Sequence, residues 1–93
     1  MAEYLVETYV AGGRAAGALV AQATAQAQAA ATNGGAAVRY VRAIFVPGDE
    51  ICFHLFEGPS RAAVAAVVAR AGLADCRIVE AVSTFIAQTE REP

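Results

Sequence analysis

Residues 38–60, VRYVRAIFVPGDEICFHLFEGPS, decide the fold of this chain. Two runs rich in β-branched and aromatic residues, 38–46 and 51–56, flank the sequence Pro-Gly-Asp-Glu at 47–50, and this pattern predicts a β-hairpin with a short turn. The segment also contains the single histidine of the chain, His54, and one of its two cysteines, Cys52. The hairpin therefore brings structural and chemical signals together in one place.

The segments on either side of the hairpin predict two further strands and two helices. Residues 3–10 (EYLVETYV) and 77–82 (RIVEAV) have the composition of strands. A long alanine-rich helix is expected from about residue 14 until Asn-Gly-Gly at 33–35 ends it, and Ser60 is placed to cap a second helix that Gly72 ends. The expected buried positions are Leu19, Val20, Ala23, Ala27, Ala30 and Ala31 in the first helix, and Val64, Val67, Val68 and Ala71 in the second.

The resulting order, βαββαβ, predicts an α+β ferredoxin-like plait: a four-stranded antiparallel sheet with both helices on one face. We expect Val6, Phe53 and Leu55 to pack on the helices. The opposite face would then carry Glu7, Tyr9, Cys52, His54 and Phe56. Because such a mixed face suits neither solvent nor a finished core, we expect it to pack on a second copy, forming a dimeric α/β barrel around a small pocket.

Composition narrows the class of protein further. The length of 93 residues predicts one domain over 1–84 with a polar tail at 85–93. Hydrophobic residues make up 57% of the chain and charged residues only 17%, and this composition indicates apolar surface left for another subunit. A net charge of −2 with both signs interspersed gives no footprint for nucleic acid or an anionic membrane. Without a leader-like start or CxxC spacing, a cytoplasmic protein with free thiols is expected.

His54, Cys52 and Glu7 are the candidate metal ligands. Imidazole, thiolate and carboxylate suit nickel or another divalent ion, and Cys52 lies two residues from His54 on the same strand face. A second subunit would have to complete the site. The alternative is a histidine that is only hydrogen-bonded inside an interface.

The remaining candidate pocket residues are Tyr9, Tyr40, Arg42, Phe56 and Glu80. A phenol with a histidine can move protons on a small enolisable ligand, although tyrosine also packs commonly in strands. Arg39 and Arg42, expected on opposite faces of their strand, can orient an anion or face water. Glu80 can pair with Glu7, or one of the two can bind an arginine.

The hairpin register is left open between two pairings. If Val46 pairs with Ile51, Ala43 lies beside His54. If Val46 pairs with Cys52 instead, Ile44 lies beside His54 and Arg42 approaches Phe56.

Three segments, 3–10, 38–60 and 77–83, together resemble a family of small actinobacterial proteins, a domain of unknown function that includes nickel-binding members. The most specific features are Tyr40, the turn with Asp49, and Phe-Glu-Gly-Pro at 56–59 before a helix. The resemblance implies a dimeric ferredoxin-like fold, and it implies nickel for some members only.

Two functions follow as expectations. The first is a dimeric ligand-binding protein, with nickel or another divalent metal as candidate ligand and no organic cofactor. The second is a cofactor-free isomerase, cyclase or monooxygenase that acts on a small aromatic or polyketide-like substrate in the barrel pocket, by analogy of fold alone. A module that only dimerises is the third interpretation.

Overall fold

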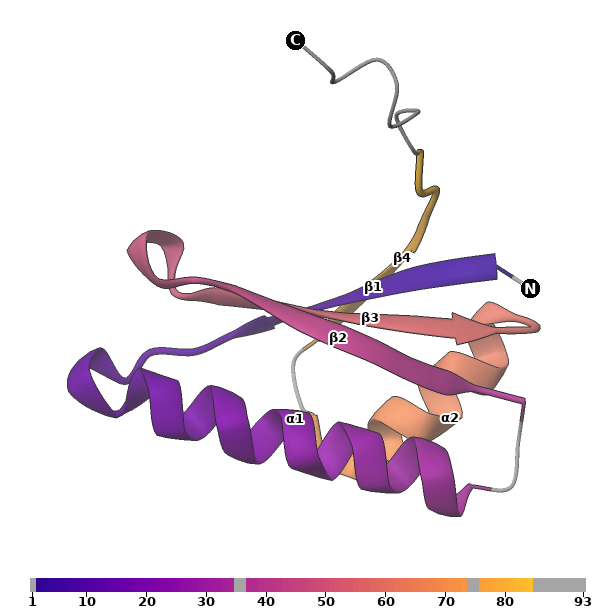
Figure 1. Ribbon diagram of the computed structural model, residues 1–93, viewed down its shortest axis with the longest axis horizontal. Coiled ribbons are helices and arrows are strands. Elements are labelled where there is room, and N and C mark those ends of the chain that lie inside the picture. The colour runs from indigo at the N-terminus through magenta and orange to yellow at the C-terminus, as the bar shows by residue number, and fades with distance from the viewer. Residues whose placement is uncertain (1, 35–36, 74–75, 85–93) are drawn as a thin grey trace, which may run out of the picture.

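The computed structural model describes residues 2–34, 37–73 and 76–84, and it contains an antiparallel sheet covered by two helices on one face (Figure 1). The strands are β1 (Ala2–Tyr9), β2 (Arg39–Val46), β3 (Ile51–Gly58) and β4 (Arg77–Ala81), in the order β2-β3-β1-β4. The helices are α1 (Ala16–Asn33) and α2 (Arg61–Ala71), and the 3₁₀ turns are η1 (Gly13–Ala15) and η2 (Pro47–Asp49). The α+β class and the antiparallel sheet are confirmed, and the topology agrees with a ferredoxin-like plait. The predicted tail, 85–93, lies outside the described residues.

The hairpin forms in the first of the two predicted registers. Val46 pairs with Ile51, and Ala43 lies opposite His54. The 3₁₀ turn η2 joins the strands, and Glu50 follows it with a left-handed backbone, φ 55°. Residues other than glycine rarely adopt this backbone conformation outside turns, and Glu50 adopts it because it closes the short connection between β2 and β3.

Helix α2 begins and ends where its sequence predicts. The Ser60 hydroxyl accepts a hydrogen bond from the Ala63 amide at 3.1 Å, which satisfies one of the free amides of the first turn. Gly72 ends the helix with φ 76°, a conformation that costs glycine little. The predicted core positions of this helix are all buried: Val64, Val67, Val68 and Ala71.

Helix α1 is buried mainly in its second half. Ala27, Ala30 and Ala31 are buried against the sheet and α2, whereas Leu19, expected on the buried side, is 43% exposed. That prediction was wrong for Leu19, whereas Ala16 and Val20 of the same turns pack in the smaller core cluster. The cap at Gly34 is right-handed, with φ −71°, rather than left-handed, and Gly35 lies outside the described residues.

The core fills the space between the sheet and the two helices. Its larger cluster joins β1 and β3 to both helices through Tyr4, Val6, Phe56, Ala27 and Val64. A smaller cluster beneath the start of α1 contains Val10, Ala16 and Cys52. None of the helices in the described part of the chain is long and apolar enough to cross a membrane.

The faces of β3 are exchanged relative to the sequence prediction, whereas Val6, Glu7 and Tyr9 of β1 lie on the predicted faces. Val6 pairs with His54 and Thr8 with Cys52, and these four side chains all lie on the helix-covered face and are buried. The prediction placed Phe53 and Leu55 there instead. Alternation alone cannot decide which face is buried when both faces carry large apolar residues. In the structure the set with Phe56 is buried, and Phe56 packs with Val64 of α2.

Candidate functional site

The hairpin presents two candidate sites, one on each face of the sheet. Beneath α1, His54 has contacts with two other functional side chains, Cys52 and Tyr40. On the opposite side lies the open face, which we define as the residues of the four strands that point away from the helices: Glu3, Leu5, Glu7, Tyr9, Arg39, Arg42, Ile44, Val46, Ile51, Phe53, Leu55, Glu57, Arg77, Val79 and Ala81.

The buried cluster is a chain of three polar side chains. The Tyr40 hydroxyl lies 2.8 Å from His54 Nδ1, and Cys52 Sγ lies 3.6 Å from Nε2. A neutral imidazole has one N–H and one lone pair, so one neighbour donates to the ring and the other accepts from it. His54 and Cys52 are both 0% exposed, and the Tyr40 ring packs edge-on against Phe56.

Burial sets the protonation of this cluster. It lowers the pKa of His54 and raises the pKa of Cys52, because each charged form would lose its hydration. It also raises the pKa of the Tyr40 phenol. The resting pair is therefore a thiol beside a neutral imidazole, and a thiolate nucleophile is not favoured. The alternative expectation of a hydrogen-bonded histidine agrees with this geometry, but the histidine lies in the domain core.

Glu7 does not join His54 and Cys52, which corrects the predicted set of metal ligands. It lies opposite Phe53 on the open face, and its carboxylate is 4.0 Å from the Arg77 guanidinium. Cys52 and His54 are adjacent enough to share an ion, but within the described ranges no group of three His, Cys, Asp or Glu side chains is placed to hold one. The donor set therefore provides two ligands of a possible site and lacks the third.

The predicted pocket residues are also divided between the two faces of the sheet. Tyr40 and Phe56 lie under the helices, and Arg42 lies on the open face. Tyr9, 67% exposed, donates its hydroxyl to Glu50 at 2.8 Å, and this hydrogen bond to a carboxylate raises its pKa. Glu80 lies opposite Tyr4 and does not share a face with Glu7, which rules out the carboxylate pair. The other alternative agrees with the structure, since Glu7 forms an ion pair with Arg77.

The open face has an apolar centre with polar residues around it. Two rows that run across all four strands, Arg42–Leu55–Leu5–Val79 and Ile44–Phe53–Glu7–Arg77, contribute most of the apolar side chains. Leu55 is buried by its neighbours, whereas Ile44 is 44% exposed. No helix of the described chain covers this face (Figure 1).

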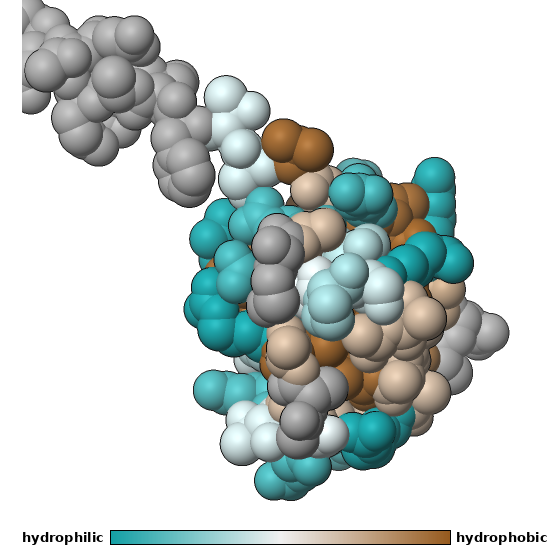
Figure 2. Space-filling model, turned by 90° about the vertical axis from the view of Figure 1, so that its right-hand side faces the viewer, coloured by the Kyte–Doolittle hydropathy of each residue, from teal (hydrophilic) through white to brown (hydrophobic). Residues whose placement is uncertain are grey.

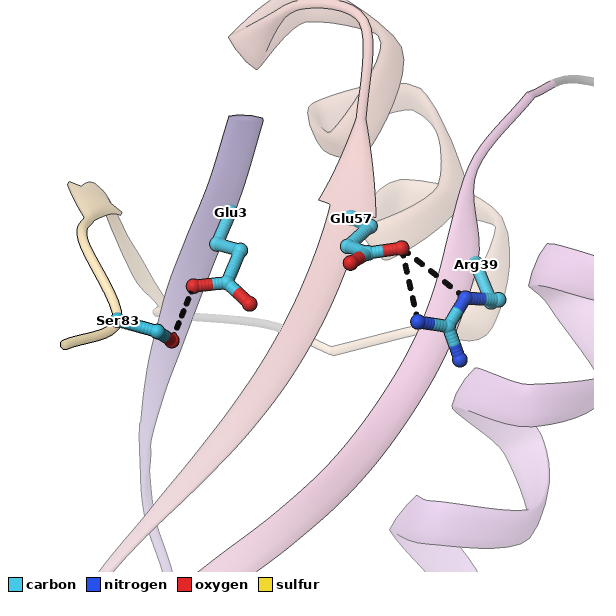
Figure 3. A network of polar contacts seen from close by, with 4 residues as sticks. All are labelled: Glu3, Arg39, Glu57 and Ser83. Carbon is cyan, nitrogen blue, oxygen red and sulfur yellow. Dashed lines mark hydrogen bonds and ion pairs between the residues drawn. The ribbon is translucent and has the colours of Figure 1, made fainter. Parts of the chain in front are cut away.

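Charged residues close the end of the open face near the start of β1 (Figure 3). Arg39 donates from two nitrogens to Glu57 Oε1, at 2.8 and 3.0 Å, and the Ser83 hydroxyl bonds Glu3. The two carboxylates thus lie on neighbouring strands, each with its own partner. Together with Glu80 they line a shallow depression of about 580 Å³, at the end of the molecule where Figure 2 shows hydrophilic side chains bordering hydrophobic ones.

A smaller hollow of about 210 Å³ lies at the opposite end of the sheet, beside the end of β1. Glu7, Thr8, Tyr9, Ile51 and Arg77 line it. It forms where β1 continues beyond Arg77, the first residue of β4, because the pairing of these strands extends only from Glu3 to Glu7 on β1. Neither hollow is lined by His54 or Tyr40.

Arg42 reaches the open face because of a β-bulge that the sequence did not reveal. The register of β2 shifts between Tyr40 and Arg42, so that Val41 is an extra residue. Arg39 and Arg42 consequently lie on the same face, whereas strict alternation predicted opposite faces. The same bulge directs Tyr40 toward His54.

Comparison of this chain with protein-family models, with curated proteins and with solved structures finds no match. The resemblance to the actinobacterial family therefore stays a prediction.

Proposed function

We propose that this protein is a homodimeric ligand-binding protein in which the open faces of two sheets pack together and enclose a small, mainly apolar ligand space. The observation that carries the proposal is the apolar centre of a sheet face that no helix of the described chain covers. In this proposal the dimeric barrel forms around the open face, and the buried His54 cluster serves the core of each subunit.

The apolar centre supports association because its side chains gain free energy when they leave water. Full burial of one leucine or phenylalanine side chain contributes roughly 1.5–3 kcal/mol. Leu5, Ile44, Phe53 and Val79 are half-buried or exposed in the single chain, so each has surface left to bury. Such an arrangement, an apolar centre with a polar rim, is typical of protein interfaces.

A second copy of this chain fits the face better than a strongly charged partner does. The face carries three arginines, Arg39, Arg42 and Arg77, and three glutamates, Glu3, Glu7 and Glu57. With equal numbers of both signs, two identical faces do not repel each other as two faces of one sign would. A two-fold axis then brings the same patch together from both subunits.

Native mass spectrometry of the full chain tests the proposal, because one spectrum reports subunit number and any retained small molecule. We expect a dimer, and we expect Phe53→Glu to yield a folded monomer since it places a charge in the apolar centre. Gln22→Glu, on the exposed surface of α1, is the matched control and keeps the dimer. A wild-type chain that stays monomeric at micromolar concentration would overturn the proposal.

Metal binding is a second candidate, favoured by one distance. Cys52 Sγ and His54 Nε2 are 3.6 Å apart, and two ligands on one tetrahedral ion, with metal–sulfur near 2.3 Å and metal–nitrogen near 2.0 Å, lie roughly 3.5 Å apart. The Tyr40 hydroxyl at Nδ1 would orient the ring, as outer partners of metal-bound histidines do.

Incubation with nickel before native mass spectrometry tests this candidate separately. A bound ion that Cys52→Ala and His54→Ala both abolish, and that Glu7→Gln leaves in place, would support a site beneath α1. Failure to retain nickel, or loss of nickel only in Glu7→Gln, would refute it. The enzyme alternative has less support, because His54 and Tyr40 lie in the core of the domain and not on the open face.

A further inference from the structure

We infer that Arg42 makes the open face selective for small apolar molecules that carry a carboxylate. This inference rests on the proposed function and goes beyond it by naming the chemical class of the ligand. Arg42 is the one arginine of the open face that has no acidic partner within the described ranges.

The other two arginines of the face are already paired. Arg39 binds Glu57 at 2.8 Å, and Arg77 lies 4.0 Å from Glu7. Arg42 is exposed and lies opposite Leu55, and its guanidinium has no hydrogen bond or ion pair to the rest of the described chain. It is a cation beside apolar neighbours.

Covering the open face would remove water from this guanidinium. Burial of a charge without a partner is strongly unfavourable, so the covered state needs an anion at Arg42. A carboxylate is well suited because it accepts two parallel N–H hydrogen bonds from one guanidinium.

On the open face of a second copy, two of the three carboxylates already pair with an arginine of their own chain, Glu57 with Arg39 and Glu7 with Arg77. The third, Glu3, accepts a hydrogen bond from the Ser83 hydroxyl at the end of the face near the start of β1. Breaking one of these pairs to satisfy Arg42 would leave another group without its partner. A ligand carboxylate satisfies Arg42 without that loss.

The neighbours of Arg42 define the rest of the ligand. Leu55, Leu5 and Val79 continue the same cross-strand row, and Ile44 is the next residue of β2 on the open face. A ligand bound through its carboxylate would therefore rest its body on aliphatic side chains. This arrangement favours a compact amphipathic acid over a sugar, a nucleotide or a free inorganic anion.

Isothermal titration of the full chain with 2-naphthoate and with the neutral 2-naphthamide tests the inference. Both probes have the same apolar body, and only the first is an anion. We expect naphthoate to bind at least tenfold more tightly, and Arg42→Gln to remove this preference. Arg14→Gln, an exposed arginine in η1 outside the sheet, is the matched control and keeps it.

Two readouts separate this inference from the proposed function. Subunit number, measured on the same samples, reports on the dimer, whereas the affinity ratio of the two probes reports on Arg42. Equal affinities, no binding of either probe, or a preference that survives Arg42→Gln would overturn the inference even in a dimeric protein. Circular dichroism of Arg42→Gln establishes that a lost preference does not come from unfolding.

Discussion

The buried imidazole of His54 predicts that the protein loses stability in mild acid. His54 is the only histidine of the chain, it is fully buried, and burial lowers its pKa below the ordinary value near 6.5. The unfolded chain binds a proton on this ring as pH falls through 6.5, while the folded chain does not. Unfolding is then coupled to proton uptake, so the free energy of unfolding falls as pH falls.

The size of the effect follows from linkage. Where the unfolded chain holds one proton more than the folded chain, the free energy of unfolding changes by about 1.4 kcal/mol per pH unit. Titration of the unfolded ring between pH 7.5 and 5.5 gives an upper bound of roughly 1.4 kcal/mol for the whole interval. A domain of this length has a total stability of roughly 5–14 kcal/mol, so the loss is measurable.

Urea unfolding followed by far-ultraviolet circular dichroism at pH 7.5, 6.5 and 5.5 measures the effect, at one protein concentration so that dimerisation does not vary. His54→Asn is the comparison, since an amide keeps hydrogen-bonding capacity and does not titrate. The difference between the two pH slopes isolates the ring, because all other titratable groups are shared. Equal slopes in both proteins would show that the imidazole is protonated, or accessible, in the folded state, and would refute the reasoning.

Three further results are expected. Phe56→Ala lowers the free energy of unfolding by about 3–5 kcal/mol in urea titrations, because it leaves a cavity in the centre of the larger core cluster; a loss below about 1 kcal/mol would contradict this packing. Ser60→Ala costs about 1 kcal/mol in the same assay through loss of the cap on α2, and an unchanged midpoint would show that the cap is not formed. With iodoacetamide at pH 8, Cys76, which is half-buried, is alkylated well before Cys52, whose burial raises its pKa; peptide mass spectrometry that finds Cys52 modified first would refute this order.

The sequence predicted the elements of the fold because their boundaries depend on local signals. The turn at 47–50, the cap at Ser60 and the glycine at position 72 each act within a few residues of the chain, and the structure contains all three. The periodicity of α2 was equally informative, since its valines recur at a regular helical spacing. These features require no knowledge of what packs against them.

The faces of the sheet could not be predicted in the same way. From Ile51 to Phe56, β3 carries an apolar or aromatic side chain at every position, so alternation identifies two sets and does not say which one the helices cover. A histidine and a cysteine suggested an exposed functional face. Burial is nevertheless acceptable for both, because Tyr40 and Cys52 satisfy the two ring nitrogens of His54.

The prediction of the candidate site failed for the same reason, because it required knowing which face of β3 the helices cover. Glu7 and His54 are close in register, as neighbouring strands require, yet they point to opposite sides of the sheet. The position of Arg42 on the same face as Arg39 could not be predicted for a different reason, because a β-bulge leaves no reliable signal in a single sequence. Only the pairing of strands revealed which arginines share a face.

The extra residue Val41 has an evolutionary consequence. Upstream and downstream of it, the side chains of β2 follow opposite phases of alternation, so one insertion or deletion at this position moves every residue on one side of it to the other face. Substitution changes the ligand surface one side chain at a time, whereas loss of Val41 would exchange core and surface residues together. Binding preference can therefore drift through Arg42 and Ile44, but the length of β2 has to stay constant while it does.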